Sequence, residues 1–240
     1  MSTRKALAYS LLDRYAGLIL AIVSSMILSR LLSPAEIGVF SVTMVLLSFV
    51  ATIRDLGAGQ YLVQVKELTT ERIRDVWAVQ LGLGTTLALV ILAASDAVAS
   101  FYQEPRMKDI MLVLAANYVV TPFGSLTYAW LMREMRFETL ATIRFGSTLA
   151  GSLISIALAW QDYGPISLAL GSLATAIANA GLATYYRPRS FPWLPGVKGL
   201  KQVVSFGSTI AGSSILNTST VAMPELFLGK LQGMTDTGLY

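Results

Sequence analysis

The chain alternates long apolar stretches with short polar segments along its length. A helix needs roughly 20 apolar residues to cross the hydrocarbon core of a bilayer. Seven stretches approach that length, at residues 9–29, 36–54, 76–95, 109–131, 143–161, 165–184 and 203–223. Two of them open with residue pairs that are typical of helix starts, Ser33-Pro34 and Gly164-Pro165. The pattern predicts an all-α, polytopic membrane helical bundle with about seven transmembrane helices.

The composition is typical of a membrane protein and lacks two residue types that are common in active sites, cysteine and histidine. Hydrophobic residues make up 54% of the chain and charged residues 13%, whereas about a quarter of the residues in soluble domains are charged. Cysteine and histidine are both absent, which excludes disulfides, thiol nucleophiles, imidazole bases and ordinary zinc sites from these residues. We find no catalytic triad, metal-binding carboxylate pair or specific phosphate-binding glycine loop. We expect no enzyme activity, no metal, no cofactor and no nucleic-acid partner.

The basic N-terminus raises the alternative of a cleaved signal peptide. Arg4 and Lys5 precede an apolar run, as they do in secretory signals. That run contains Asp13 and Arg14, continues to about residue 29 and lacks a convincing small-residue cleavage site. We predict that it remains in the protein as the first span.

Lysine and arginine are distributed unevenly between the two sides of the predicted bundle. Alternate loops place 14 of the 18 cations on the side of the N-terminus and four on the other side. Loops rich in Lys and Arg stay in the cytoplasm. We therefore predict a multi-pass protein with a cytoplasmic N-terminus.

A short motif recurs 200 positions later in the chain. Arg30, Leu31, Gly38 and Phe40 of the first copy correspond to Lys230, Leu231, Gly238 and Tyr240 of the second. Six predicted spans separate the copies, so the repeats have the same orientation in the membrane. We expect residues 1–200 to form a six-helix lobe and residues 201–240 to begin a second, homologous lobe. The proline-rich residues 185–202 are the expected connection, and the chain then holds one half of a two-lobe protein and the start of the next.

Three arginines are expected at the cytoplasmic mouth of the first lobe: Arg14, about one turn into the first helix, Arg54 and Arg144. Charged side chains in or near the bilayer are costly and often mark functional sites. A guanidinium group binds phosphate oxygens through two parallel hydrogen bonds, which suits a pyrophosphate-linked substrate. The alternative is that these arginines serve membrane topology alone.

Besides Asn217, three amides lie inside predicted spans, namely Gln80, Asn117 and Asn179. Polar side chains in a membrane bundle face its interior or a cavity. The three amides either contact a polar substrate or join helices by hydrogen bonds.

Four further charged residues are candidates for a functional role. Arg30 and Lys230 occupy equivalent places in the two repeats on the outer side, where they either contact head groups or stabilise a turn. Asp13, beside a predicted cytoplasmic vestibule, and Glu225, beside Pro224, are the candidate coupling acids.

Small residues and one proline shape the predicted helices. The fifth and sixth spans carry small or short polar residues at four-residue intervals, namely Ser147, Gly151 and Ser155, and Ser167, Gly171, Thr175, Asn179 and Ala183. Such faces allow the backbones of two helices to approach closely. Pro122 lies within the fourth span, where it removes a helical hydrogen bond, so we predict a kink that is either a hinge or a static bend.

Five short motifs follow one another at residues 29–40, 55–64, 101–105, 133–137 and 229–240. In order and spacing they resemble the bacterial polysaccharide transporter family. This family contains the O-antigen and exopolysaccharide flippases of the multidrug/oligosaccharidyl-lipid/polysaccharide exporter superfamily. The likeness covers essentially the whole chain.

The resemblance implies a V-shaped transporter of the bacterial inner membrane, with two six-helix lobes around a central cationic cavity. Such a protein moves undecaprenyl-diphosphate-linked oligosaccharide units to the periplasmic leaflet by alternating access, for lipopolysaccharide or exopolysaccharide synthesis. A charged head group cannot cross roughly 30 Å of hydrocarbon unaided, whereas a polar groove lowers that barrier. The expected partners are the bilayer, the lipid-linked oligosaccharide, and polysaccharide polymerase and assembly proteins.

Two other functions are compatible with the architecture. Multidrug or cation efflux occurs in the same superfamily, but cation export favours buried carboxylates, of which this half has few. A membrane-bound polysaccharide polymerase or ligase generally needs a large outer loop or an acid/base pair. The longest outer loop expected here covers only residues 96–108.

Overall fold

The computed structural model describes residues 3–55, 61–63, 69–192, 194–196, 199–200, 203 and 205. Within them, side chains are described from Tyr15 onward, except at positions 52, 53 and 55. The regular elements of this part of the chain are α-helices: α1 (Thr3–Leu31), α2 (Pro34–Asp55), α4 (Thr70–Tyr102), α5 (Arg106–Val120), α6 (Pro122–Arg133), α7 (Phe137–Trp160) and α8 (Ile166–Tyr185). The predicted all-α class is confirmed.

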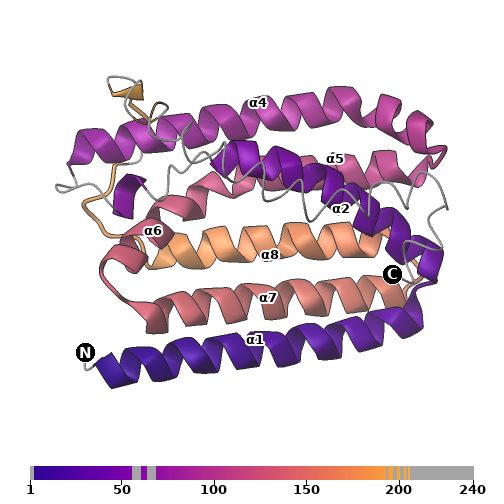
Figure 1. Ribbon diagram of the computed structural model, residues 1–240, viewed down its shortest axis with the longest axis horizontal. Coiled ribbons are helices and arrows are strands. Elements are labelled where there is room, and N and C mark those ends of the chain that lie inside the picture. The colour runs from indigo at the N-terminus through magenta and orange to yellow at the C-terminus, as the bar shows by residue number, and fades with distance from the viewer. Residues whose placement is uncertain are drawn as a thin grey trace.

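The helices run back and forth along the long axis of the molecule (Figure 1). The α1–α2, α4–α5 and α7–α8 turns therefore lie at one end, which we call the acidic end. At the opposite end, the basic end, α2, α6 and α8 finish and α4 and α7 begin. The names refer to the charged side chains described below.

Four helices, α2, α4, α7 and α8, are long and apolar enough to cross a membrane. The α5–α6 pair adds a fifth span, bent by 49° at its break. Within the described side chains α1 qualifies only as a shorter apolar helix, Tyr15–Leu31. The chain is thus a multi-pass membrane protein. The seventh predicted span, 203–223, lies outside the described residues except at positions 203 and 205.

Helix ends extend beyond the apolar windows from which the spans were predicted. The span predicted at 76–95 is the 33-residue helix α4, which the Thr69 side chain caps by accepting from the Arg72 amide. It ends where Gln103 takes a left-handed conformation, with φ of 55°. The outer loop expected at 96–108 is consequently mostly helical. Capping and turn residues, rather than hydrophobicity, set these ends.

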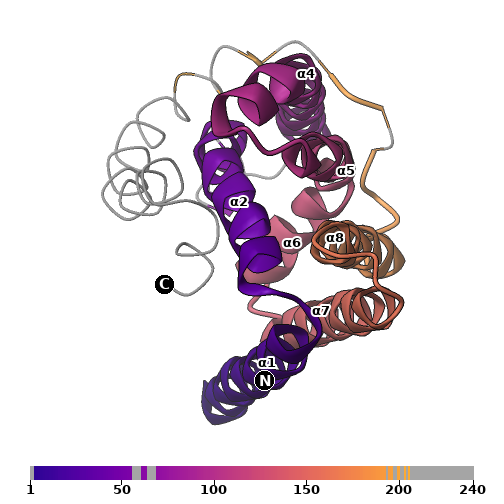
Figure 2. The same ribbon diagram turned by 90° about the vertical axis from the view of Figure 1, so that its right-hand side faces the viewer.

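The helices pack in a continuous series. α1 packs on α7, α7 on α8, and α8 on both α5 and α6, while α4 packs on α5 (Figures 1 and 2). α2 crosses the bundle against α4 and α5. A buried apolar cluster fills the space between these three helices, and its innermost members are Val39, Val42, Met107, Ile110 and Leu114.

The predicted small-residue faces of α7 and α8 do meet. A Cβ atom added at Gly151 would collide with Thr175 and would lie 2.6 Å from the Gly171 carbonyl oxygen. One added at Gly171 would lie 2.6 Å from Cβ of Ser155. The Ser155 hydroxyl also donates to the Ser167 carbonyl oxygen across the helix pair, at 3.1 Å. The prediction of close backbone approach is confirmed, and we call this contact the α7–α8 seam.

The predicted kink at Pro122 is also confirmed, since α5 ends at Val120 and α6 begins at Pro122. Proline has no amide hydrogen to donate to the carbonyl of Tyr118, four residues earlier. Gly84 of α4 packs against that same carbonyl oxygen, with which any Cβ at position 84 would collide. A glycine Cα–H is a weak donor at such contacts. The α5–α6 break therefore packs directly against α4 at Gly84.

Candidate functional site

Four of the predicted site residues contact the α5–α6 break or the turns beside it. Gln80 of α4 accepts a hydrogen bond from the Ser125 hydroxyl, just beyond the break. Asn117, one turn before the break, donates to the Ser172 hydroxyl of α8 at 3.0 Å. The amide oxygen of Asn179 faces Gly124, where a Cβ would lie 3.2 Å from it. The fourth residue, Arg54, contacts Tyr118 as described next.

Arg54, in the last turn of α2, lies over an aromatic ring. Its guanidinium carbon is 5.2 Å from the ring centroid of Tyr118 in α5. Tyr118 is buried, and its hydroxyl donates to the Leu47 carbonyl oxygen of α2 at 2.5 Å. The aromatic ring attracts the cation through its quadrupole and carries no charge of its own. The structure thus holds a positive charge next to the break.

The amides near the break mainly join helices. Gln80 links α4 to α6, and Asn117 links α5 to α8. Of the two predicted roles, substrate contact and hydrogen bonding between helices, these contacts support the second for Gln80 and Asn117. The amide oxygen of Asn117 is buried without a partner among the described residues.

Arg144 has a separate aromatic partner. Its guanidinium carbon is 5.2 Å from the ring centroid of Tyr128 in α6, and it also donates a hydrogen bond to the hydroxyl of that ring. Arg144 is exposed, whereas Arg54 is half-buried. The two arginines predicted to share a mouth therefore lie at the same end on different helices, each with its own ring.

Several predicted site residues lie outside the described side chains, namely Asp13, Arg14, Glu225 and Lys230. The predicted depth of Arg14, about one turn into the first helix, is wrong, because α1 begins at Thr3. Position 14 is thus about three turns into α1. The apolar window starts later than the helix does, and it placed the helix start too late.

Arg30 is exposed in the last turn of α1. A cation at this position interacts favourably with the unpaired carbonyl groups at a helix C-terminus. The position of Arg30 therefore suits the structural alternative, a role at the turn between α1 and α2.

The basic end carries an excess of positive charge among the described side chains. It holds eight arginines (Arg54, Arg72, Arg74, Arg133, Arg136, Arg144, Arg187 and Arg189) and four carboxylates (Glu71, Asp75, Glu134 and Glu138). Besides Arg54 and Arg144, two of these arginines lie over rings, Arg136 over Trp130 at 5.6 Å and Arg187 over Trp77 at 5.3 Å. Aromatic rings thus hold four guanidinium groups at this end without cancelling their charge.

The acidic end has the opposite balance and a different kind of contact. It holds three cations (Arg30, Arg106 and Lys108) and five carboxylates (Glu36, Asp96, Glu104, Asp109 and Asp162) among the described side chains. Arg106 pairs with Glu104 at 2.7 Å, and Lys108 pairs with Asp96 at 2.6 Å. The hydrogen bond and charge of Arg106 lower the pKa of the Glu104 carboxyl, against a smaller opposing effect of burial.

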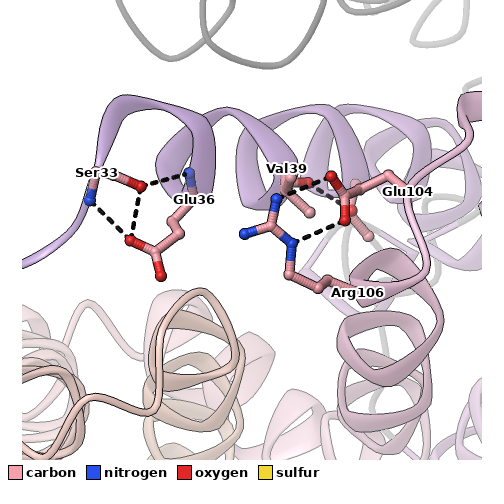
Figure 3. A network of polar contacts seen from close by, with 6 residues as sticks. Ser33, Glu36, Val39, Glu104 and Arg106 are labelled. Atoms are coloured by element: carbon pink, nitrogen blue, oxygen red, sulfur yellow. Dashed lines mark hydrogen bonds and ion pairs between the residues drawn. The ribbon is translucent and has the colours of Figure 1, made fainter.

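The start of α2 at this end is built as its sequence predicted. The Ser33 hydroxyl and amide both donate to the Glu36 carboxylate, and Ser33 accepts from the Glu36 amide (Figure 3). This reciprocal arrangement is a capping box. The second carboxylate oxygen of Glu36 lies against Gly164, whose φ of 60° and lack of a side chain leave room for it.

Sequence reasoning missed the partners of the arginines and one buried acid. The sequence did not indicate that the rings of Tyr118, Tyr128 and Trp77 contact arginine guanidinium groups. Asp75 lies just outside the span predicted at 76–95, yet it is only 5% exposed. The position of this carboxylate, directly before an apolar stretch, was the feature of the sequence that could have indicated its burial.

Comparison with protein-family models matches residues 27–240 to the family described as "Polysaccharide biosynthesis protein". The match covers most of the chain. The chain belongs to this family. The basic and acidic ends described above therefore belong to a member of a polysaccharide biosynthesis family.

Curated relatives from three bacteria agree with this family. The chain is 23% identical over 227 residues to the lipopolysaccharide biosynthesis protein WzxC of Escherichia coli K12, which covers 92% of this chain and 45% of the relative. It is 27% identical over 235 residues to the succinoglycan biosynthesis transport protein ExoT of Rhizobium meliloti, covering 97% and 47%. It is 22% identical over 197 residues to the teichuronic acid biosynthesis protein TuaB of Bacillus subtilis, covering 80% and 40%.

The chain spans about half the length of the curated relatives it matches. No solved structure gives a significant match. The membership in the polysaccharide biosynthesis family therefore rests on sequence, and the arrangement of the helices comes from this structure.

Proposed function

We propose that this protein moves an undecaprenyl-diphosphate-linked oligosaccharide across the bacterial inner membrane by alternating access. In this proposal the described helices belong to the first of two lobes, and the basic end faces the cytoplasm. Family membership and the name of ExoT, a transport protein, support transport rather than catalysis. Partners beyond the lipid substrate, such as polymerase and assembly proteins, follow from the same proposal.

The observation that carries the proposal is the positive excess at the basic end, with Arg54 held by Tyr118 beside the α5–α6 break. A diphosphate head group needs positive charge where it leaves water, and guanidinium groups supply both positive charge and the planar N–H geometry that suits phosphate oxygens. The excess at this end also fits a cytoplasmic orientation by the distribution of basic residues. No covalent step is needed, because the substrate changes leaflet without changing bonds.

The test is a transport assay with variants of Arg54. Inverted membrane vesicles receive the lipid-linked oligosaccharide on their outer, cytoplasmic face, and the fraction that becomes protected from an added glycosidase is measured over time. We expect Arg54→Gln to lower the initial rate about tenfold or more, the loss of one charged hydrogen bond to phosphate. Arg54→Lys should retain an intermediate rate because a point charge replaces the planar fork.

The matched control is Arg189→Gln, which removes the same charge from an exposed arginine at the same end. Its rate should remain close to that of the unaltered protein. Equal losses in the two variants would mean that only overall charge matters and would remove Arg54 from the site. No protection in vesicles that contain the unaltered protein would overturn the proposed function itself.

A further inference from the structure

The segment that follows α8 lies against the first turns of α4, although about 120 positions separate them in the chain. The Gly196 amide donates to the Arg74 carbonyl oxygen at 3.0 Å. The Arg74 side chain donates through Nε to the Leu194 carbonyl oxygen, also at 3.0 Å. The Gly199 amide donates to Oδ2 of Asp75 at 3.0 Å. We call the described residues 194–196, 199–200 and 203 of this segment the strap.

Asp75 acts as a cap for the helix that begins in the strap. A helical turn starts at Leu200, and the Val203 amide donates back to the Gly199 carbonyl oxygen at 3.4 Å. The first amides of a helix lack partners within it, and a carboxylate is favoured there both as acceptor and as negative charge. Burying a carboxylate is costly unless donors compensate it. The Gly199 amide therefore supplies a donor to the buried carboxylate of Asp75, and the carboxylate supplies an acceptor to an amide at the start of the helix.

Apolar packing holds the same region. Val203 and Phe191 are buried in one cluster with residues of α4 and α6, which include Val76, Trp77 and Leu126. The rings of Phe191 and Trp130 meet edge to face at 6.2 Å between centroids. Arg187 covers Trp77 and donates to the Pro192 carbonyl oxygen. Releasing the strap would expose this cluster and break three hydrogen bonds together.

The two glycines of the strap are needed for this close approach. A Cβ at Gly196 would lie 2.9 Å from Cβ of Arg74, and one at Gly199 would lie 2.5 Å from Oδ2 of Asp75. Both distances are shorter than ordinary contacts. A side chain at Gly199 would displace the carboxylate that anchors the strap, whereas a side chain at Gly196 needs a shift of about 1 Å to reach the ~3.8 Å between the Cβ atoms of a disulfide.

We propose that Asp75 anchors the strap and the start of the following helix to α4, so that they move with the first lobe as one body. The inference rests on the proposed function for the movement itself. It adds to the expectation that residues 185–202 connect two lobes, because it attaches the end of that connection to the first lobe. Segments with buried contacts and several hydrogen bonds open far less often than exposed loops. The relative motion of the lobes must then be absorbed outside the strap.

The first test locks the strap with a disulfide in a chain that has no native cysteine. The pair Arg74→Cys and Gly196→Cys places two Cβ atoms about 1 Å closer than the ~3.8 Å of a disulfide, a distance that small shifts restore. After oxidation, we expect transport in the vesicle assay to stay within about twofold of the reduced protein, because an anchored strap does not need to open. A loss of about tenfold or more that dithiothreitol reverses would overturn the proposal. Arg74→Cys alone controls for the loss of the Arg74 side chain, and Gly196→Cys alone controls for the side chain added to the strap.

The second test measures the anchor without transport. Asp75→Asn and Asp75→Ala are added to the cysteine pair, and the rate of disulfide formation is followed by gel mobility in membranes. An undocked strap lowers the effective concentration of one thiol near the other, so we expect a slower rate with Asn and about tenfold slower with Ala. Glu138→Ala, which removes an exposed carboxylate at the same end, should leave the rate unchanged.

Equal disulfide rates with and without Asp75 would overturn its role as the anchor. This readout is independent of the substrate. A protein whose reduced form transports nothing would contradict the proposed function, and the disulfide rates would still decide whether Asp75 holds the strap.

Discussion

The α7–α8 seam and the α5–α6 break show two different ways of packing membrane helices. In the seam, Gly151 and Gly171 remove side chains so that two unbroken helices touch along their backbones. At the break, Pro122 interrupts a helix, and polar and aromatic side chains of three neighbouring helices cover the interruption. Van der Waals packing dominates the first contact and hydrogen bonds the second.

The difference indicates which part of the bundle is rigid and which can change. Close-packed backbones have one arrangement, because any added atom collides. The break has fewer regular hydrogen bonds, and its Tyr118 carbonyl is supported by Gly84 of another helix rather than by its own. Ser125 and Thr121 donate back to carbonyl oxygens of their own chain on either side of the break, which favours bending. Arg54 lies beside this interrupted helix, over the ring of Tyr118.

The largest expected effect follows from filling the seam. Gly151→Leu places a side chain where the first added carbon already collides with Thr175. Overpacking against backbone should lower the free energy of unfolding by about 3 kcal/mol or more, or prevent folding. Unfolding by dodecyl sulfate in mixed micelles, followed by circular dichroism, measures this.

The matched control for the seam is Gly181→Leu in α8. No atom lies within 4 Å of a Cβ at that position. A glycine replaced by a better helix former in open space should leave stability unchanged or raise it slightly. If both leucine variants were equally stable, the seam would not be the rigid contact that we describe.

The second prediction concerns the packing of the break against α4. Gly84→Ala adds one carbon against the Tyr118 carbonyl oxygen, whereas Gly82→Ala, half a turn away, meets nothing within 4 Å. We expect the first variant to lose about 1–3 kcal/mol in the same assay and the second to lose nothing. A loss smaller than that of Gly151→Leu would fit a break that shifts to make room. A loss as large would show that the two contacts are equally rigid.

Local features of both contacts were predictable from the sequence. The four-residue spacing of Ser147, Gly151 and Ser155 identified the seam, because that spacing places residues on one helix face. Pro122 identified the break, because proline cannot donate to the preceding turn. The spans, the Ser33 cap and the all-α class were predictable for the same reason, since each depends on neighbours within a few residues.

Contacts between distant residues were not predictable in this way. Asp75 bonds to Gly199 across 124 positions, and Tyr118 meets Leu47 across 71. Periodicity identifies a buried face but not which residue of another helix lies opposite. The same limit left Gln80 and Asn117 with two open roles until their partners, Ser125 and Ser172, were known.

The third prediction tests whether polar bonds hold the break together. Gln80→Leu and Ser125→Ala remove the two partners of one bond, singly and together, and the four stabilities form a double-mutant cycle. We expect a coupling of about 1 kcal/mol, in the range of hydrogen bonds between membrane helices. A cycle for Ser155→Ala and Ser167→Ala across the seam should give a smaller coupling, because the Ser155 hydroxyl donates to the Ser167 backbone carbonyl, which the second substitution leaves in place. Equal couplings would remove the distinction between a polar and an apolar contact.

The smallest expected effect is that of Tyr118→Phe, which separates the two functions of that side chain at the break. The variant loses the hydroxyl that donates to Leu47 and keeps the ring beneath Arg54. Stability should fall by about 0.5–1.5 kcal/mol, the net value of one hydrogen bond, while the transport rate should stay close to normal because the guanidinium is still held. Tyr118→Leu removes the buried ring as well and should lose more stability than Tyr118→Phe through the cavity that it leaves. At equal amounts of folded protein it should also lower transport further, since a cation–π contact contributes about 0.5–2 kcal/mol to holding the charge in place. Equal transport in the two variants would mean that Arg54 keeps its position without the ring, and the break would then differ from the seam in packing alone.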